Sequence, residues 1–340
     1  WISGVTTIAS LLTRPIAGFM LDKYNKKVIL IIGIGVIITT TFLFGFISAI
    51  GMILFVRFLY GIGWGFASTA SNTLATNVIP EKKFGEGMGY FGLSSGLAMA
   101  FAPTFALSIL GMTGFRNTTI FSVVIATVAL VLAKIFSTEK NKTTSATKSI
   151  KALYERESMI PSVIMFYVTA SYGAIIGFIA IYGAQRGIEN IGLFFTIYAI
   201  AVMIFRPVAG KIIDKYGYTY IMMPGLILLT VALFILSKSM QLQGFLCSAF
   251  LYGVAFGAVQ SCLQTIAIVK APPGRKGAAN ATFFTGFDAG IGFGSVIGGM
   301  IASSFGYSRM YQFFGSVMIV AFLIYAVFNF KEKKIKSTNE

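Results

Sequence analysis

The stretch RPIAGFMLDKY at residues 14–24 recurs in modified form as RPVAGKIIDKY at residues 206–216. The offset between the two copies is 192 residues (206 − 14), and at this offset residues 58–61 and 250–253 both read FLYG. Further matches at the same offset are Gly65 with Gly257, Pro80 with Pro272, Gly85 with Gly277 and Gly114 with Gly306. Chance similarity between apolar segments does not keep its register over about a hundred residues, so the sequence predicts two homologous halves arranged as parallel repeats.

The composition predicts an all-α membrane protein. Of the 340 residues, 56% are hydrophobic and 11% are charged, and the mean hydropathy is +0.82, whereas soluble domains carry about 25% charged residues. The apolar runs are about 20 residues long, enough to cross a hydrocarbon core about 30 Å thick as helices. They are too long for barrel strands and do not alternate polar with apolar residues. The eleven predicted spans are 1–21, 28–48, 51–79, 85–110, 115–136, 159–183, 190–213, 219–237, 242–270, 277–303 and 307–330.

One long polar segment, residues 137–158, divides the chain after the fifth span. It is rich in Ser, Thr and Lys, so we expect a solvated linker. The predicted domains are an N-terminal bundle at 1–136, the linker, a C-terminal six-helix bundle at 159–330 and a tail at 331–340. Because the counterpart of the span at 159–183 would lie before Trp1, we expect the intact protein to have one further N-terminal helix.

The distribution of basic residues predicts the orientation in the membrane. Twenty of the 27 Lys and Arg residues lie on the side of the linker and the tail, and four lie on the opposite side. Cytoplasmic loops carry such an excess of positive charge, so we expect the linker and the C-terminus in the cytoplasm and the chain in the plasma membrane. This asymmetry explains the net charge of +16 without a nucleic-acid partner. We expect a monomer whose partners are the lipid bilayer, a small-molecule substrate and protons.

The sequence lacks the residues that most enzymes need. It has no histidine, which excludes Ser-His-Asp and Cys-His catalysis and histidine metal sites. Cys247 and Cys262 lie on one predicted helix, too far apart for a disulfide. No phosphate-binding loop is present. We therefore predict no enzyme activity, no cofactor and no metal site, and transport that uses an ion gradient or runs downhill.

Residues 18–27, GFMLDKYNKK, resemble the signature loop of the major facilitator superfamily, G-x-L-a-D-R-x-G-R-K. With the repeat, the resemblance covers the whole chain. It implies the major facilitator fold, two pseudo-symmetric six-helix bundles of which the first helix is missing here. Within the family, the chain is most similar to bacterial drug–proton antiporters.

In that family the signature loop is a latch that holds one access state, and the resemblance implies a gating role for both copies. Physically, a glycine lets two helices approach closely, and a carboxylate at a helix end can bind the N-terminal amides of a neighbouring helix or a basic side chain. The alternative is a basic turn that only fixes topology. The gating candidates are Gly18, Asp22, Lys23 and Lys27 in the first copy, and Gly210, Asp214 and Lys215 in the second.

Arg57 lies well inside the predicted span 51–79, where an arginine is costly and usually marks a pathway. It is followed by Gly61 in a segment that resembles the family's fourth-helix motif R-x-x-Q-G, with Tyr60 replacing glutamine. The family link is with proton coupling. The repeat counterpart is Ala249, so the scaffold does not require the arginine. The alternative is an arginine that binds backbone carbonyls or extends to the membrane surface.

Asp288 is the only acid deep inside a predicted span, about 16 Å along the helix from the start of span 277–303. A carboxyl group there can bind and release a proton, so we predict a proton or cationic-substrate site. Its repeat counterpart is Gly96, and symmetry again does not demand the acid. The alternative is a structural ion-pair partner for Arg14 or Arg57.

Mirrored polar pairs predict the substrate cavity. Ser68 and Asn72 share one helix face, and the offset of 192 carries them to Gln260 and Gln264. Such positions are expected where two halves face a water-accessible path, and interhelical hydrogen bonding is the alternative. Two further cavity candidates are Tyr167 and Tyr172. By contrast, Gly286, Gly290, Gly294 and Gly298 recur every four residues, which predicts close helix packing.

These features predict a secondary active transporter that exports small molecules in exchange for protons by alternating access. The 33 Phe and 14 Met residues favour an adaptable apolar cavity, and the absence of a charged cluster there argues against a highly anionic substrate. Two alternatives remain open. One is a proton-coupled importer or uniporter of a sugar or other metabolite, and the other is a non-transporting membrane sensor with the same fold.

Overall fold

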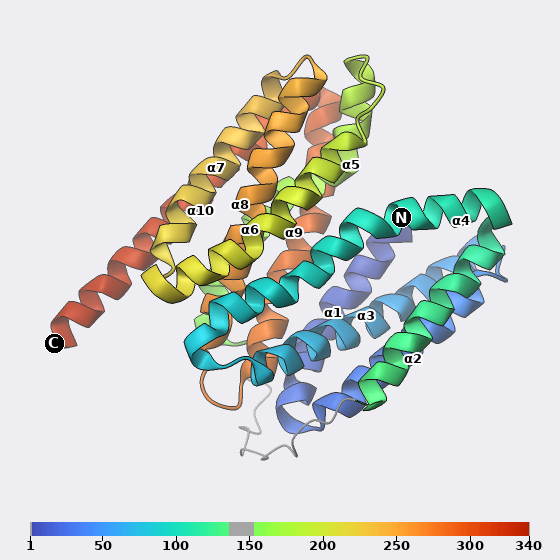
Figure 1. The fold of residues 1–340 in the computed structure, drawn as a ribbon, viewed down its shortest axis with the longest axis horizontal. Helices are drawn as coiled ribbons and strands as arrows, with labels where there is room; N and C mark the ends of the chain where they lie inside the picture. The colour runs from blue at the N-terminus through green and yellow to red at the C-terminus, as the bar shows by residue number, and fades with distance from the viewer. Residues whose placement is uncertain (1, 136–152, 340) are drawn as a thin grey trace. The chain divides into compact units, whose positions relative to one another are not determined.

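The computed structural model describes residues 2–135 and 153–339, with the side chains of 2–3, 99–100, 103–104, 107 and 331–339 outside the description. These residues are almost entirely helical, and no strand occurs among them. The helices (Figure 1) are α1 (Ile2–Lys23), α2 (Lys26–Phe44), α3 (Ile50–Val78), α4 (Phe84–Ile135), α5 (Met159–Gln185), α6 (Leu193–Tyr216), α7 (Thr219–Lys238), α8 (Leu242–Val269), α9 (Lys276–Phe305) and α10 (Tyr307–Asn339). The predicted fold class, an all-helical membrane protein, is confirmed.

The fourth and fifth predicted spans form one long element, α4, broken at Gly114. This glycine has φ 81° and ψ 174°, a backbone conformation that favours glycine because it has no Cβ. Figure 1 shows the sharp bend in the ribbon of α4. Its repeat counterpart Gly306, between α9 and α10, has φ 83°. The same residue therefore makes the same turn at equivalent places in the two sequence halves.

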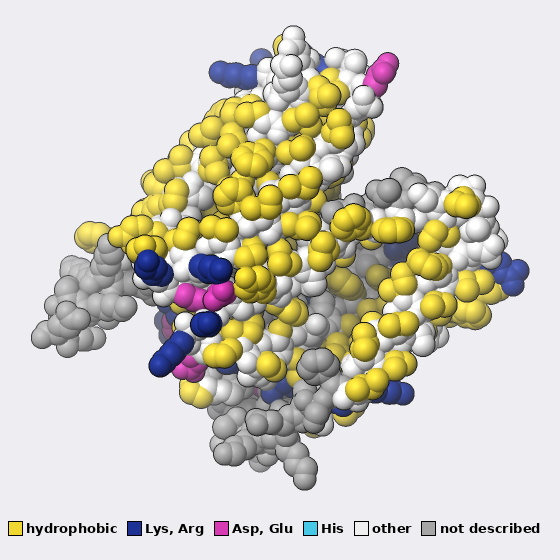
Figure 2. All heavy atoms as spheres, in the orientation of Figure 1, with side chains coloured by type: hydrophobic (Ala, Val, Ile, Leu, Met, Phe, Trp, Pro, Cys, Tyr) yellow, Lys and Arg dark blue, Asp and Glu magenta, His cyan; other side chains and the backbone are white. Residues whose placement is uncertain are grey.

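The helix surfaces suit a bilayer. Ten helical stretches of the described chain are long and apolar enough to cross a membrane, and Figure 2 shows hydrophobic side chains along the helix shafts with charged groups gathered near helix ends. Large apolar side chains are exposed in mid-helix, such as Ile32, Val128 and Phe293. In water such a surface would aggregate, whereas lipid accommodates it because each helix satisfies its own backbone hydrogen bonds.

The chain forms two compact units, each with segments from both sides of the predicted linker. Unit 1 comprises Trp1–Val78, Phe101–Met159 and Ala267–Asp288, and unit 2 comprises Ile79–Ala100, Ile160–Ile266 and Ala289–Glu340. In unit 1, α3 packs along α1 and α2, and the first part of α9 joins them. In unit 2, α10 packs along α7, and the first part of α4 joins α6. The predicted division into sequence domains at 137–158 stays a prediction.

Two of the last residues of the predicted linker, Glu155 and Ser158, are buried rather than solvated. Residues 136–152 lie outside the described residues, but Glu155 is buried and forms an ion pair with Arg275 in the loop before α9. The Glu155 amide donates to Thr282 Oγ1 over 2.9 Å, and the Ser158 hydroxyl donates to the Ala267 carbonyl over 2.7 Å. The expectation of a fully solvated segment is therefore wrong at this end, because residues more than a hundred positions later supply the partners.

Candidate functional site

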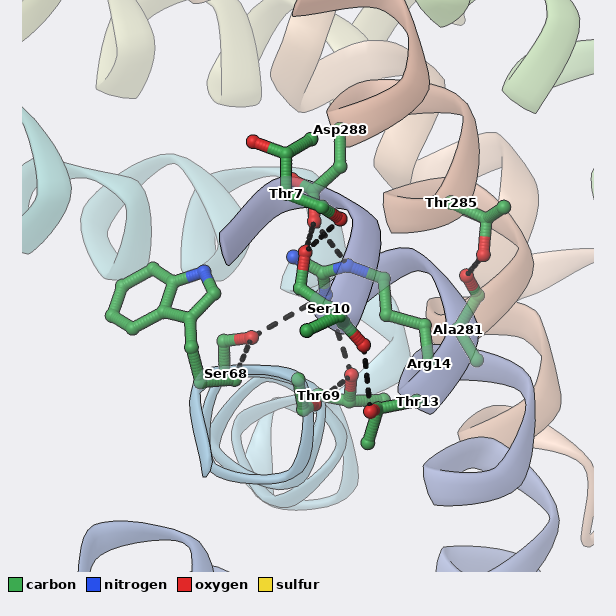
Figure 3. Close-up of polar contacts among 12 residues, drawn as sticks. Thr7, Ser10, Thr13, Arg14, Ser68, Thr69, Ala281, Thr285 and Asp288 are labelled. Atoms are coloured by element: carbon green, nitrogen blue, oxygen red, sulfur yellow. Dashed lines mark hydrogen bonds and ion pairs between the residues drawn. The ribbon is translucent and has the colours of Figure 1, made fainter. Parts of the chain in front are cut away.

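A buried ion pair joins α1 to α9 in unit 1 (Figure 3). Arg14 Nε donates to Asp288 Oδ2 over 2.7 Å. The arginine side chain is 2% exposed and the aspartate side chain 12% exposed. An ionised pair at this depth has lost most of its hydration, which its mutual attraction must offset. The structure therefore brings Asp288 to Arg14, one of the two arginines considered as its partner from the sequence.

Neutral polar groups and a ring complete the surroundings of this pair. The Ser10 hydroxyl lies 2.9 Å from Asp288 Oδ2 and donates to it. Arg14 Nη1 donates to Ser68 Oγ and Thr69 Oγ1, each over 3.3 Å, and its guanidinium carbon lies 4.9 Å from the centre of the Phe284 ring. In Figure 3 the hydroxyl groups of Ser10 on α1 and of Ser68 and Thr69 on α3 lie around the Arg14 guanidinium and the Asp288 carboxylate. The predicted cavity residue Ser68 is thus a partner of Arg14.

Arg57 lies apart from this network. Its guanidinium carbon lies 4.4 Å from the centre of the Phe44 ring, and its buried Nε has no hydrogen-bond partner among the described residues. No ion pair joins it to Asp288 within that part of the chain. The two residues predicted to couple protons are therefore not brought into contact.

Unit 2 repeats the arginine of unit 1 but not its acid. Arg206, the counterpart of Arg14, donates to the Gln260 side-chain oxygen and to the Gly92 carbonyl of α4. Gln260 is the counterpart of Ser68, so the same two repeat positions hold each other in both halves. Position 96, which corresponds to Asp288, is glycine. The arginine is 5% exposed and has no ionised partner among the described residues.

The first signature copy binds the start of α9. Asp22, in the last turn of α1, accepts hydrogen bonds from the Gly277 amide over 2.7 Å and the Ala278 amide over 3.0 Å. A carboxylate is favoured at a helix N-terminus, where free amides and the helix dipole present positive charge. The two helices can approach this closely because Gly18 has no Cβ. A Cβ there would clash with the Ala281 Cβ, at 2.5 Å. We call the contact of Gly18 and Asp22 with Gly277 and Ala278 the first latch.

The second signature copy makes the same contact in unit 2. Asp214, near the end of α6, accepts hydrogen bonds from the Gly85 and Glu86 amides at the start of α4, each over 2.8 Å. A Cβ at Gly85 would lie 2.7 Å from Asp214 Oδ1 and 2.8 Å from the Gly210 carbonyl oxygen. We call the contact of Gly210 and Asp214 with Gly85 and Glu86 the second latch. Each latch joins a helix of one sequence half to a helix of the other half.

The three lysines predicted to take part in gating, Lys23, Lys27 and Lys215, contact other groups. Lys23 Nζ lies 4.8 Å from the centre of the Phe19 ring, and Lys215 Nζ lies 5.0 Å from that of Tyr216. Lys27 donates from Nζ to the Lys134 carbonyl over 2.6 Å. The latch contacts in the described chain are thus made by carboxylates and glycines.

The other predicted cavity residues lie in two environments. Asn72 donates from its side-chain amide to the Ser68 carbonyl over 2.8 Å, within its own helix. Tyr172 is buried in an aromatic cluster, with its ring centre 5.7 Å from that of Tyr198 and 5.0 Å from that of Phe256. Two further candidates are Gln264, which is buried on α8, and Tyr167, which is half-buried with its ring edge-on to Phe166.

Sequence reasoning missed some residues that complete these sites. Ser10 and Thr69 stand in the Arg14 network, and Tyr198 and Tyr252 belong to the aromatic cluster of unit 2. One signal was available: Arg14 and Arg206 recur symmetrically before proline, which marks them as anchors of the repeat. The neutral partners carry no such signal, because Ser, Thr and Tyr are common in membrane helices.

Comparison with known proteins gives the family. The model of the Major Facilitator Superfamily matches residues 1–288 and, in a second match, 162–340. The chain belongs to the major facilitator superfamily. Like its relatives in that superfamily, it is a multi-pass membrane transporter, and the overlap of the two matches is what a duplicated major facilitator would produce.

Two relatives and one solved structure extend across most of this major facilitator chain. The staphylopine export protein of Staphylococcus aureus is 24% identical over 341 residues, covering 95% of this chain and 85% of the relative. The multidrug resistance protein MdtG of Proteus mirabilis is 21% identical over 353 residues, covering 98% and 85%. The crystal structure of the human organic anion transporter MFSD10 (TETRAN) aligns with a TM-score of 0.83 at 14% identity, covering 95% of this chain and 82% of that one. This last likeness shows that the fold is shared.

Substitution of Asp22 by asparagine is expected to weaken the first latch of this major facilitator. One of the two helix amides keeps a neutral acceptor, but the charge at the helix N-terminus is lost. Charge-assisted hydrogen bonds of this kind contribute about 1.5–3 kcal/mol, so the thermal unfolding midpoint in detergent should fall. Lys23→Gln, one residue away on a side chain that lies over a ring, is the matched control and should leave the midpoint unchanged. Equal midpoints for Asp22→Asn and the wild type would contradict the assigned contact.

Proposed function

We propose that this chain exports small molecules from the cell in exchange for protons, by alternating access, with Asp288 as the proton-binding group. The observation that carries the proposal is the buried ion pair of Asp288 with Arg14, which joins α1 to α9. The carboxylate is the more exposed member of the pair, at 12%, and it is the member that binds the proton in this proposal. Its partner, 2% exposed, keeps its charge whatever the proton does, because a guanidinium does not deprotonate in proteins.

Protonation of Asp288 is the step that loosens the helix pair. The neutral acid no longer attracts Arg14 as an ion, although it can still form hydrogen bonds. The first latch lies on the same two helices, with Asp22 eight residues after Arg14 and therefore about 12 Å along α1. Both contacts must release for α1 and α9 to part, so the charge on Asp288 biases the latch.

The second latch makes the same contact as the first, but unit 2 has glycine at position 96, where unit 1 has the proton-binding Asp288. In our proposal the α6–α4 contact opens and closes with the α1–α9 contact, while the proton is bound only in unit 1. The two sequence halves then move against each other, with the linker and C-terminus in the cytoplasm. This asymmetry between equivalent positions is a way to couple one proton-binding site to a symmetric motion.

The relatives support export. One is named for the export of staphylopine and another for multidrug resistance, and both match more than nine-tenths of this chain. We assign Ser68, Asn72, Gln260, Gln264, Tyr167 and Tyr172 to the substrate path, and Arg57 to the proton path. The plasma membrane is the proposed location, because the proton gradient that drives export in this proposal lies across it.

Energised bacterial cells that express the full-length protein should accumulate less of at least one tracer than cells with an empty vector. The tracers are ethidium, a cation; Nile red, which is neutral; and 1-naphthoate, an anion. Addition of a protonophore should remove the difference, because the export is driven by protons. Higher accumulation than in control cells would indicate import instead, and equal accumulation of all three, with no flux in proteoliposomes, would support a non-transporting sensor.

A further inference from the structure

Arg206 is a buried cation that the chain itself does not neutralise. It is 5% exposed, and among the described residues its hydrogen-bond acceptors are the neutral Gly92 carbonyl and the neutral Gln260 side chain. Its Nε is buried without a hydrogen-bond partner in the same part of the chain. A charge in the low dielectric of a protein interior is costly unless it is paired. The arginine therefore has both an unmet donor and an unmatched charge.

Comparison with the other half shows what is missing. Arg14 occupies the equivalent position and binds Asp288, and Gly96 stands where the repeat would place that acid. A Cβ at Gly96 would meet the side chains of Met203, at 3.2 Å, and Val202, at 3.8 Å, and no backbone atom of another helix within 4 Å. The space that a carboxylate would occupy at position 96 is therefore bordered by side chains and not by the backbone of another helix.

The residues near Arg206 form a buried aromatic cluster with polar edges. Tyr198 lies about two turns before Arg206 on the same helix, α6, and its ring is stacked on that of Tyr172 with the ring centres 5.7 Å apart. Beyond them the Tyr252 hydroxyl lies 2.8 Å from the Ser171 hydroxyl. Aromatic rings bind apolar ring systems by stacking, and phenol hydroxyls donate hydrogen bonds to anions.

We propose that Arg206 binds the anionic group of an organic anion, of the carboxylate class, whose apolar body packs against Tyr172 and Tyr198. The ligand carboxylate supplies to Arg206 the charge that Asp288 supplies to Arg14. This inference rests on the proposed transport cycle, in which α4 and α6 part. Gly92 belongs to α4 and Arg206 to α6, so their separation removes the Gly92 carbonyl from Arg206 Nη1. Nη1 then becomes a second free donor beside Nε. The sequence-based expectation was against a highly anionic substrate, and the proposed ligand carries a single negative charge.

Binding of radiolabelled 1-naphthoate to the purified full-length protein in detergent tests this site. Wild type should bind 1-naphthoate and should not bind 1-naphthamide, which has the same shape without the charge. Arg206→Gln should weaken binding about tenfold or more, since hydrogen bonds to charged groups are worth that much. Arg309→Gln, at an exposed position on α10, is the matched control and should bind as wild type does.

A second variant keeps the test valid if Arg206→Gln does not fold. Gly96→Asp places in unit 2 the acid that unit 1 has at position 288, and it should raise the unfolding midpoint while abolishing naphthoate binding. No naphthoate binding by wild type, equal binding of the amide, or unchanged binding in Gly96→Asp would overturn the proposal. Assays with chloride replaced by gluconate identify the anion. Stabilisation by chloride in the absence of naphthoate binding means an inorganic ion site and also overturns it.

The failure of this site and the failure of transport have different signatures. If ethidium or Nile red is exported but naphthoate binding is the same in wild type and Arg206→Gln, the anion site is wrong and the proposed function stands. If naphthoate binds through Arg206 and no tracer is moved in cells or proteoliposomes, the proposed function is wrong and the site stands.

Discussion

Asp288→Asn is expected to abolish tracer transport driven by a pH gradient in proteoliposomes while preserving tracer exchange at equal pH on both sides. Asparagine keeps the size and one acceptor of the side chain, so Ser10 and Arg14 retain a neutral partner. It cannot bind and release a proton, and Arg14 loses its counter-charge. Transport should therefore uncouple from protons, with gradient-driven uptake reduced to the rate of empty liposomes.

The same variant has a consequence for stability. Removal of one partner of a buried ion pair leaves an uncompensated charge and costs about 3–5 kcal/mol, so the unfolding midpoint should fall. The double variant Arg14→Gln with Asp288→Asn removes both charges and should recover part of the loss, without recovering proton coupling. Gradient-driven transport by Asp288→Asn at the wild-type rate would contradict the role of this carboxyl group.

Valine at Gly18 is the second change with a large expected effect. A Cβ there would lie 2.5 Å from the Ala281 Cβ and 2.9 Å from the Gly277 carbonyl oxygen, so the first latch cannot close without displacement of a backbone. Overpacking of this kind typically costs about 1–3 kcal/mol, and here it falls on the contact that must form once in each cycle. Transport should be lost even if the protein still inserts and folds.

Gly35→Val is the matched control in the same unit. A Cβ at Gly35 in α2 meets nothing within 4 Å, so this variant should transport and unfold as wild type does. The measurement is tracer flux per reconstituted protein together with the unfolding midpoint. A Gly18→Val protein that transports at the wild-type rate would show that the latch need not close.

Much of the fold followed from the sequence because the repeat carried structural information. The matched pair Gly114 and Gly306 marks two turns with positive φ, and Gly85 and Gly277 are retained because a side chain there would meet the latch carboxylates. The four-residue glycine spacing predicted close packing, and Gly294 lies against the backbone of Ala170. Each of these is a local demand that one residue type satisfies.

Partner choice was harder to predict because it depends on tertiary distance. A carboxylate at a helix end was expected to bind helix amides, but nothing in the sequence near Asp22 specifies the start of α9, 255 residues away. The burial of Glu155 depends in the same way on Arg275, 120 residues later. Arg57 and Asp288 were predicted for one function, and the structure places a different arginine beside the acid.

The most direct test of the account is proton movement through the wild-type protein in proteoliposomes that contain a trapped pH indicator. When an exported tracer is added outside without an imposed pH gradient, its entry should raise the internal pH, because protons leave the liposome in exchange. Asp288→Asn should show tracer exchange with no pH change. Tracer flux through the wild type with no accompanying proton movement would contradict the account.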